Sequence, residues 1–483
     1  MDERRLNVPC MLDLPDFSAA PWQWGASCAL AQGADRLSYA GLHAQVIERA
    51  RRLASGGLKP GEVVMVPDAP AWDLVIMQHS LARSGAALFP FRADLPAFEL
   101  AKLSQLVGAE WRWHRQSACL ERTHCSLIQS ASADSTEVRA LIKTSGSSGE
   151  PKVAMLTGAN LLASALAANQ RLGLGASDLW LACLRLSHIG GLAIGYRCAL
   201  AGATLLLHDG FDAAAVARDL AQWPVTHLSL VPPMLARLLD LGCLPPAQLS
   251  VLLVGGQAVS PSLARRALGA GWPLHLTYGM TETTSQIATR KVTAIREPDA
   301  TLAGEPLPGV ELDLHGCDAA TRPPRPLRVR GPMVMAGYAG PDRLPGRGLQ
   351  PGGWLEAADL ACLSSDGQLR ILGRADDVLV IGGVNVSRAA VQRRVCEAPG
   401  VRDCVVVGLR EAVWGFRLAL AYEGEVTEVD LEQWCRSSLM SHERPRVFMR
   451  VEQLPLLASG KHDRVRIGAM LEAMSGGSGA QPA

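Results

Sequence analysis

The chain has 483 residues, 48% of them hydrophobic, and its 47 basic and 46 acidic side chains leave a net charge of +1. This length allows two or three domains and a sizeable core. A charge so close to neutral argues against general electrostatic binding of nucleic acid or of an anionic membrane. These properties leave a large globular protein as the expected class.

The twelve cysteines are scattered and form no Cys-x-x-Cys pair, so neither a zinc knuckle nor a redox motif is supported. Such cysteines in a long chain are typical of a cytoplasmic protein with reduced thiols. The N-terminus has charges but no apolar stretch behind them, unlike a signal peptide. The most apolar segment, 186–207, contains His188, Arg197 and four glycines, which predicts a buried strand and helix and no membrane span.

Helical and strand patterns alternate from residue 38 to residue 130. Helices are expected at 38–54, where Ser38 is a candidate N-cap, and at 72–84. Strands are expected at 62–66 and 86–90. This alternation predicts a mainly parallel sheet with helices on its faces.

A loop rich in hydroxyl groups lies between an expected strand at 138–143 and an expected helix at 158–171. It consists of Thr144, Ser145, Gly146, Ser147, Ser148, Gly149 and, after Glu150 and Pro151, Lys152. Hydroxyls, backbone N–H groups in a tight turn and one cation suit a polyphosphate. A surface linker would not need such flanks, and a Walker A loop has no residues between its second glycine and its lysine. The loop therefore predicts phosphate binding.

The alternation continues to residue 277. Strands are expected at 179–184, 203–207, 225–231, 249–254 and 273–277, and helices at 213–222, 233–241 and after Ser260. The last two strands lead into polar loops, 255–257 and 278–282. Ligands collect outside the carboxyl ends of strands in open α/β sheets, so these loops and the hydroxyl loop are expected to be three walls of one site. Glu282, the only acid in its loop, is a candidate Mg²⁺ ligand.

Residues 304–372 are dense in proline and predict short antiparallel strands, with a hairpin turn at Asp366-Gly367. A boundary is expected near 373–377, followed by a compact α+β unit. The fold class predicted is α/β, with a large N-terminal domain of mainly parallel sheets flanked by helices, a small antiparallel β region, and a small mobile C-terminal α+β domain. The domain bounds are 1–373 and 374–470, followed by a flexible tail at 471–483.

In this order, the pieces resemble the adenylate-forming superfamily: acyl- and aryl-CoA ligases, luciferases and the adenylation domains of peptide synthetases. The resemblance covers about residues 38–464 and rests on six ordered pieces. They are the hydroxyl loop, His188, the Gly255-Gly256 loop, Tyr278-Gly-Met-Thr-Glu282, Asp359 with Arg374, and Gly460-Lys461. The resemblance implies an enzyme that joins a carboxylic acid to a thiol, with ATP, Mg²⁺ and coenzyme A as reactants and cofactors.

The resemblance also implies a role for each matching residue. ATP binding falls to Thr144, Ser145, Gly146, Ser147, Ser148, Gly149, Lys152, Gly255, Gly256, Gln257, Tyr278, Thr281, Asp359, Arg374 and Lys461. The catalytic set is Lys461, Thr281, Glu282 and His188, with Glu282 holding the metal. Asp376 matches the hinge, while Gly382 and Gly383 would flank the tunnel for CoA. The family usually has glutamates where this chain has Ala390 and Gln392.

Substrate binding is expected at His188, Arg197, Ser229, Gly279 and Ser285. An arginine among apolar residues is costly unless paired, and a second substrate carboxylate would pair with Arg197. A protein acid, or a head group that reaches the surface, is the alternative. The set resembles the o-succinylbenzoate–CoA ligases of menaquinone synthesis.

Three other functions stay open at this point. They are a CoA ligase for another aryl or fatty acid, an adenylating enzyme that loads a carrier protein, and a non-catalytic relic. The sequence does not distinguish a monomer from a homo-oligomer.

Overall fold

The structure is a computed structural model that describes residues 24–123, 137–144, 151–293, 299, 301–314, 316, 324–381, 383–411, 414–457 and 460–476. The chain divides into two compact units. Unit 1 comprises Met1–Asp209, Thr281–Thr284 and Pro332–Gly348, and unit 2 comprises Gly210–Met280, Ser285–Gly331 and Leu349–Ala483. Since unit 2 extends on both sides of residue 373, the domain boundary expected there stays a prediction.

Unit 1 contains a seven-stranded sheet. Its order is β18 (Gly337–Tyr338), β8 (Val153–Thr157), β7 (Val138–Lys143), β4 (Ala87–Phe91), β3 (Val63–Pro67), β5 (Trp111–His114) and β6 (Cys119–Arg122). The inner strands β7, β4, β3 and β5 are parallel, and β18, β8 and β6 pair antiparallel. β4 is buried on both faces, which explains its unbroken apolar sequence.

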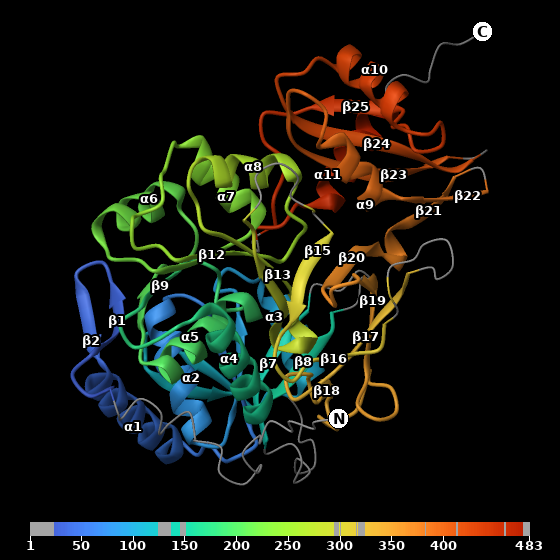
Figure 1. The fold of residues 1–483 in the computed structure, drawn as a ribbon. Coiled ribbons are helices and arrows are strands. Elements are labelled where there is room, and N and C mark those ends of the chain that lie inside the picture. The colour runs from blue at the N-terminus through green and yellow to red at the C-terminus, as the bar shows by residue number, and fades with distance from the viewer. Residues whose placement is uncertain are drawn as a thin grey trace, which may run out of the picture. The chain divides into compact units, whose positions relative to one another are not determined.

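Unit 1 also contains the neighbouring strands β9 (Leu179–Ala182), β10 (Thr204–Leu207), β1 (Cys28–Gln32) and β2 (Asp35–Ser38). Its helices are α1 (Tyr39–Ser55), α2 (Ala71–Arg83), α3 (Ala97–Val107), α4 (Gly158–Leu172) and α5 (Ile189–Ala201). Ser38 caps α1, as expected, because its Oγ accepts from the N–H of Gly41. α4 packs against α5, and α1 against α2 (Figure 1).

Unit 2 contains nine consecutive strands of one sheet. They are β16 (Glu311–Leu312), β17 (Arg325–Arg330), β19 (Leu355–Leu363), β20 (Leu369–Arg374), β15 (Leu302–Pro306), β14 (Ser285–Lys291), β13 (Leu274–Met280), β12 (Val251–Val254) and β11 (His227–Leu230). β11, β12 and β13 are parallel, and the others pair antiparallel. The helices that follow β10, β11 and β12 in the chain are α6 (Ala213–Gln222), α7 (Pro232–Asp240) and α8 (Pro261–Gly269).

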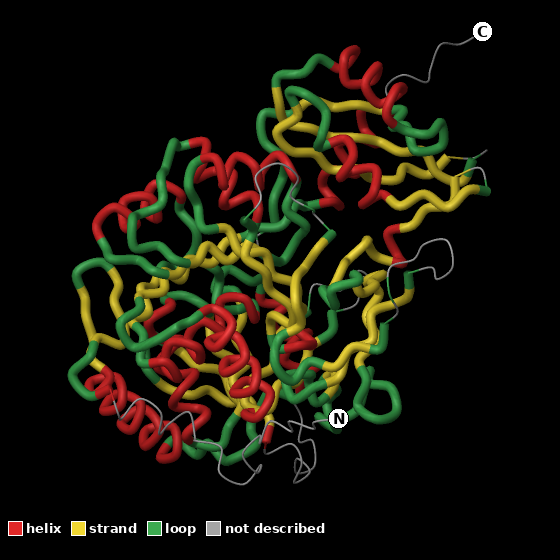
Figure 2. The backbone as a smooth tube through the Cα atoms, in the orientation of Figure 1, coloured by secondary structure: helices red, strands yellow, loops and turns green. Residues whose placement is uncertain are grey.

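The C-terminal part of unit 2 begins with the 3-10 turn η4 (Ala375–Asp377) and the hairpin β21 (Val378–Ile381)–β22 (Val384–Ser387). A sheet follows, made of β23 (Val401–Glu411), β24 (Gly415–Gly424) and β25 (Val447–Arg450), with α9 (Arg388–Val395), α10 (Glu428–Ser438) and α11 (Arg464–Gly476). Figure 2 shows these helices around the three strands. Residues of α9 and α10 pack on one face of the sheet and residues of α11 on the other.

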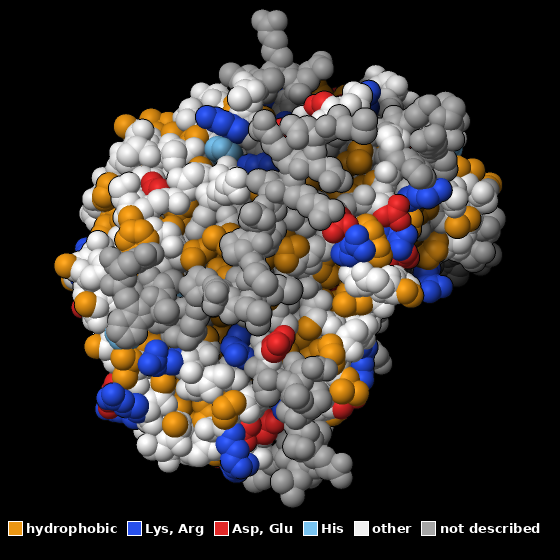
Figure 3. All heavy atoms as spheres, turned by 60° about the horizontal axis from the view of Figure 1, so that its bottom comes forward, with side chains coloured by type: hydrophobic (Ala, Val, Ile, Leu, Met, Phe, Trp, Pro, Cys, Tyr) orange, Lys and Arg blue, Asp and Glu red, His pale blue; other side chains and the backbone are white. Residues whose placement is uncertain are grey.

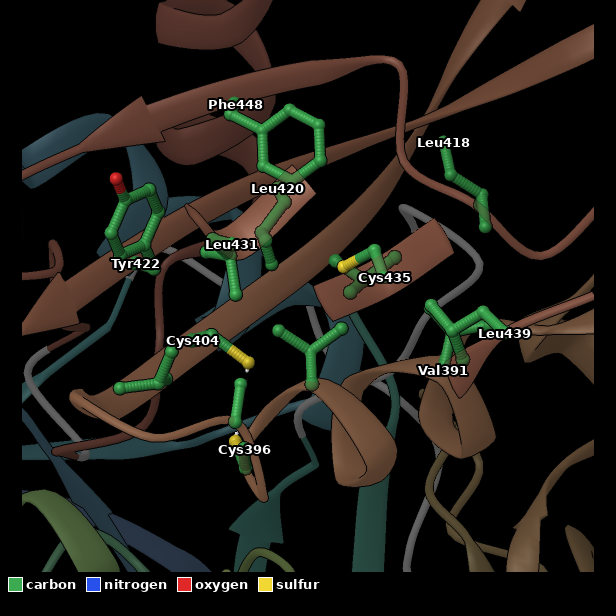
Figure 4. Close-up of a cluster of buried hydrophobic side chains, with 14 of the residues drawn as sticks. Val391, Cys396, Cys404, Leu418, Leu420, Tyr422, Leu431, Cys435, Leu439 and Phe448 are labelled. Carbon is green, nitrogen blue, oxygen red and sulfur yellow. Dashed lines mark hydrogen bonds between the residues drawn. The ribbon is translucent and has the colours of Figure 1, made fainter. Parts of the chain in front are cut away.

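The hydrophobic core between the sheet and helices α9 and α10 includes Leu420, Leu431 and Phe448 (Figure 4). Two thiols lie inside it, with the Sγ atoms of Cys396 and Cys404 3.1 Å apart. The described part of the chain contains nine cysteines, all of which were expected to be reduced thiols. Eight of them are free thiols, but Cys362 is disulfide-bonded, so the prediction of reduced thiols is wrong at that position.

The α/β class is confirmed, and three details are corrected. Tyr278, Gly279 and Met280 lie in strand β13, not in a loop, because β14 pairs with this stretch. Apart from β18, which pairs with β8, the short strands of 304–372 belong to the same sheet as β13, so this antiparallel β region continues that sheet. The tail expected from residue 471 is wrong for 471–476, since α11 runs to Gly476 and buries Leu471.

No helix within the described ranges is long and apolar enough to cross a membrane. On the face drawn in Figure 3, basic and acidic side chains lie scattered among apolar ones. That pattern agrees with the near-zero net charge.

Candidate functional site

The ends of the hydroxyl loop are held by a β-hairpin. Lys143 on β7 pairs with Val153 on β8, and the N–H of Thr144 donates to the carbonyl of Lys152 at 2.8 Å. Thr144 is buried. Ser145, Gly146, Ser147, Ser148 and Gly149 lie outside the described residues. The structure therefore brings the first and last members of the predicted phosphate loop side by side in unit 1.

Tyr338 joins the lysine of this loop to the candidate metal ligand. Its hydroxyl donates to Oε1 of Glu282 at 2.8 Å, and the Nζ of Lys152 lies 5.3 Å from the centre of its ring. Burial, followed by the charge of Glu282, raises the pKa of Tyr338, so the phenol stays a hydrogen-bond donor. Sequence reasoning missed this residue, because β18 has only two residues and no pattern of its own.

The turn that carries Thr281 and Glu282 has an unusual backbone. Thr284 and Ser285 have φ angles of 51° and 92°, a region that costs a side-chain-bearing residue about 1–3 kcal/mol. Thr284 is held on two sides, since its Oγ1 donates to the Met333 carbonyl at 2.7 Å and its carbonyl accepts from Ser164 Oγ at 2.6 Å. These contacts fix the 3-10 turn η3 (Thr281–Thr283) and the residues it presents.

His188 is the N-cap residue of α5. The residue before it, Ser187, is oriented by the buried carboxylate of Asp68. Ser187 Oγ donates to Asp68 Oδ2 at 2.6 Å, which ties the His188 segment to the end of β3. A Cβ on Gly191 would lie 2.4 Å from the carbonyl of Arg185, so only glycine allows this entry into the helix.

Arg197, nine residues after His188, is only 1% exposed. Its guanidinium carbon lies 5.7 Å from the centre of a Trp180 ring, and desolvation lowers its pKa to about 10. The head group does not reach the surface, so the snorkelling alternative is wrong. A cation so deeply buried needs compensating charge or dipoles.

In unit 2, the glycine loop after β12 lies against the loop of Lys461. A Cβ on Gly255 would lie 2.6 Å from Thr277 Cγ2, so the backbone there packs closely on β13. Gly256 has a φ of +79°, and a Cβ added to it would lie 3.5 Å from the Cε of Lys461. The lysine is thus brought to the predicted nucleotide loop, which Gln257 completes.

A second charged group of unit 2 surrounds Arg374. Its Nε and Nη2 each donate to Asp376 at 2.7 Å, and its Nη1 lies 3.8 Å from Oδ2 of Asp359, its neighbour across β19 and β20. The hydrogen bonds to Asp376, and then the charge of Asp359, raise the pKa of Arg374, to which Tyr278 also contributes. Four predicted site residues therefore form one group.

The remaining predicted residues have separate places. Ser229 is buried on β11, and a Cβ on Gly279 would lie 1.8 Å from the carbonyl of Ser285, so this hairpin requires glycine. Gly383 has a φ of +83° between β21 and β22, and Gly382 lies outside the described residues.

Gln392 accounts for one of the missing glutamates. Its Oε1 accepts from the N–H of Val406 and from Nη2 of Arg464, both at 3.3 Å. On α9, the neutral amide oxygen of Gln392 therefore accepts two hydrogen bonds at a position where the family usually has a glutamate.

Chemically, unit 1 presents hydroxyls, a lysine and one carboxylate, while unit 2 presents a lysine beside a glycine loop and an Asp–Arg pair. No cluster of three or more His, Cys, Asp or Glu side chains that could hold a metal occurs in the described part of the chain. Mg²⁺ is commonly held by one or two carboxylates together with substrate phosphates. Glu282 and the hydroxyls of its turn are oxygen donors of the kind that this ion prefers.

Comparison with known proteins identifies the class. The family model of the AMP-binding enzyme matches residues 110–339, and that of the AMP-binding enzyme C-terminal domain matches residues 391–461. The chain therefore belongs to the AMP-binding enzymes, the adenylate-forming family that its motifs predicted.

More particularly, the chain is similar to 2-succinylbenzoate–CoA ligases. That of Bacillus mycoides (strain KBAB4) is 30% identical over 464 residues, which cover 91% of this chain and 95% of the relative. A solved structure of o-succinylbenzoate CoA synthetase (MenE) from Bacillus subtilis, in complex with the acyl-adenylate OSB-AMP, is 25% identical, with a TM-score of 0.78 over 94% of this chain and 98% of that one. ATP-bound MatB from Rhodopseudomonas palustris, 20% identical with a TM-score of 0.81 over 95% and 99%, shares the fold.

Proposed function

We propose that this protein is an AMP-forming ligase that converts 2-succinylbenzoate, ATP and CoA into the acyl-CoA thioester, AMP and pyrophosphate. The most direct structural support for the ligase chemistry is the position of Lys461 at the Gly255-Gly256 loop. Support for the substrate comes from the relatives, whose names specify 2-succinylbenzoate, and from the buried Arg197. The eight free thiols among the nine described cysteines and the need for ATP and CoA favour the cytoplasm as its location.

In the first step, a carboxylate oxygen of the acid attacks the α-phosphorus of ATP while the bond to the pyrophosphate oxygen breaks. Two anions must approach each other, so positive charge has to offset their repulsion. Lys461 would lie between the attacking carboxylate and the α-phosphate, and Lys152 with the loop from Thr144 would hold the outgoing phosphates. Thr281 would donate to the α-phosphate.

Glu282 would hold Mg²⁺, which supplies charge neutralisation at the phosphate oxygens. A structure of the Bacillus subtilis MenE, 25% identical to this chain, was solved with ATP and a magnesium ion. Asp359 would accept from the ribose hydroxyls, with Arg374 beside it, and Tyr278 would lie near the adenine.

In the second step, the sulfur of CoA attacks the acyl carbon, AMP leaves, and the thiol proton is released. Lys461 has no role in this step, since no phosphoryl group is transferred. The C-terminal part would turn about Asp376 and present Gly382 and Gly383 along the pantetheine path, and His188 would lie at the thiol entry.

The substrate has a second carboxylate, which does not react. Arg197 would bind it, because a guanidinium offers two parallel N–H donors to a carboxylate and a buried cation gains most from such a partner. Ser229, Gly279 and Ser285 would line the rest of the acid pocket.

The test is to measure pyrophosphate release and thioester formation, by mass spectrometry, with 2-succinylbenzoate, benzoate and octanoate. We expect 2-succinylbenzoate to give the thioester far faster than benzoate or octanoate. Thioesters of the monoacids instead would keep the ligase chemistry and overturn the substrate. Acyl-adenylate without any CoA thioester would support a carrier-loading enzyme, and no reaction with any acid would count against the ligase.

Replacing Tyr338 by phenylalanine should raise the Mg²⁺ concentration needed for half-maximal pyrophosphate release by about 10-fold, since a hydrogen bond to a charged group contributes about 1.5–3 kcal/mol. The change removes only the hydroxyl that holds Glu282. Tyr422→Phe, whose hydroxyl donates to the Val426 carbonyl in the C-terminal part, is the control. An unchanged Mg²⁺ dependence in Tyr338→Phe would show that this bond does not position a metal ligand.

A further inference from the structure

Lys461 lies near the end of a tight hairpin. The N–H of Leu457 donates to the carbonyl of Lys461 at 2.7 Å, and the N–H of Asp463 donates to the carbonyl of Pro455 at 2.8 Å. Leu456 pairs with His462 as an antiparallel bridge. The backbone on both sides of the lysine is thus hydrogen-bonded.

The residue after the lysine is fixed by its side chain as well. Nε2 of His462 donates to Oδ2 of Asp403 at 3.0 Å, and the His462 side chain is only 9% exposed. Asp403 lies on β23, 59 positions earlier in the chain, and its other oxygen accepts from the N–H of Cys404 at 2.8 Å. The hydrogen bond from Cys404 therefore orients the carboxylate that accepts from His462.

A second carboxylate holds the start of the same hairpin. Oε1 of Glu423 accepts from the N–H of Leu454 at 2.6 Å, and Glu423 faces Asp403 across β23 and β24. Their strand neighbours Cys404 and Tyr422 point into the core drawn in Figure 4. Because successive side chains of a strand point to opposite faces, Asp403 and Glu423 face away from that core, toward the hairpin.

Strand β23, which carries Asp403, is closely packed on both faces. Cys404 and Val406 are buried on one face of β23, and Val405 and Val407 on the other. Close packing on both faces leaves little freedom to shift. The hairpin is therefore anchored at both ends to strands that are buried on both faces.

On the other side of the lysine, Gly460 has a φ of +78° and touches α7. A Cβ there would lie 2.6 Å from Val231 Cγ2 and 2.8 Å from Met234 Cε. The peptide before Lys461 is thus packed against α7, and the peptide after it is held by the histidine. The direction of the lysine side chain depends on both.

We propose that His462 and Asp403 are positioning residues for Lys461: their hydrogen bond holds the lysine at the distance from the nucleotide loop that acyl-adenylate formation requires. The proposal rests on the proposed function, in which Lys461 serves only the first step. A displacement of about 1 Å at a reacting group costs on the order of 100-fold in rate. Loss of the bond should therefore slow the first step alone.

The test uses the full chain and measures the two half-reactions separately. Acyl-adenylate formation is followed by pyrophosphate release in single-turnover mixtures, and the second step by the conversion of pre-formed acyl-adenylate and CoA into thioester. His462→Leu removes the donor and keeps an apolar side chain. His462→Gln keeps an N–H donor at nearly the same reach, and Asp403→Asn keeps an acceptor but removes the charge. Glu432→Ala, which breaks an exposed ion pair with Arg436 on α10, is the matched control.

We expect His462→Leu to slow acyl-adenylate formation about 10- to 100-fold and thioester formation less than 2-fold. His462→Gln should recover most of the loss, Asp403→Asn should lose about 3- to 10-fold in the first step only, and the control should match wild type. Equal slowing of both steps, or no recovery in His462→Gln, would overturn the positioning role. If His462→Leu fails to fold, the Gln and Asn variants still decide, since a wild-type first step in Asp403→Asn contradicts the proposal. Wild type that forms no acyl-adenylate would refute the proposed function instead.

Discussion

Replacing Lys461 by alanine should lower the rate of acyl-adenylate formation by about 100-fold or more. The removal of one preorganised charge donor from a developing anion costs about 10²–10³ in rate. The lysine lies at the Gly255-Gly256 loop, which would line the pocket for the adenine and the acyl group. Conversion of a pre-formed acyl-adenylate into the thioester should stay within about 2-fold of wild type, because that step transfers no phosphoryl group.

The measurement is single-turnover pyrophosphate release for the first step and mass spectrometry of the thioester for the second. Lys59→Ala, at an exposed lysine in the turn before β3, is the matched control. If both steps fell together, Lys461 would be a structural residue of the C-terminal part. If neither fell, the proposed bridging role would be wrong.

Replacing Arg197 by methionine should lower kcat/KM for 2-succinylbenzoate about 30-fold or more and leave that for benzoate unchanged. Methionine keeps the apolar volume and removes the charge. Truncation of one partner of a buried, hydrogen-bonded charge pair costs about 2–5 kcal/mol, and about 1.4 kcal/mol corresponds to a factor of ten. The loss should appear in KM, since the second carboxylate does not react.

The chain offers a matched control for this experiment. Arg343 is also buried, and its guanidinium is paired with Glu110, with Nη2 2.6 Å from Oε1. Arg343→Met should therefore lower thermal stability without changing the ratio of the two acids. Equal losses for 2-succinylbenzoate and benzoate in Arg197→Met would show that Arg197 supports the fold and does not select a diacid.

Elements with a complete local pattern were predicted well. Helix α6 has the expected bounds because Asp212 caps it and its apolar residues keep one face, and β7 has the expected bounds around its apolar centre, Ala140–Ile142. β14 was missed because its polar sequence, Ser285–Lys291, has no strand pattern of its own and becomes a strand only by pairing with β13. β8 was missed because five residues between a proline and a capped helix leave too little pattern to detect.

The candidate site residues also fall into two groups: those that a local sequence pattern indicates, and those that only the folded structure brings together. Glycines, hydroxyl side chains and charged residues at strand ends predict a phosphate site, because residues at this spacing can form a tight turn around an anion. The partners of these residues depend on long-range register, which no local pattern contains. Tyr338 meets Glu282 from 56 positions away, and the acceptor on α9 turned out to be Gln392 in place of a glutamate. The strained Thr284–Ser285 turn was equally invisible, since nothing in two hydroxyl residues indicates a positive φ.

The ion pair of Arg374 and Asp376 bears on how easily the hinge could reverse. Both side chains are open to water, with exposed fractions of 42% and 39%. Exposed ion pairs contribute about 1 kcal/mol or less, with bidentate pairs such as this one at the upper end of that range, and they weaken as salt is added. A turn of the chain after Arg374 would therefore break a contact that re-forms as readily as it is lost. The pair would favour one angle of the proposed hinge without trapping it, which suits the motion proposed between the two half-reactions.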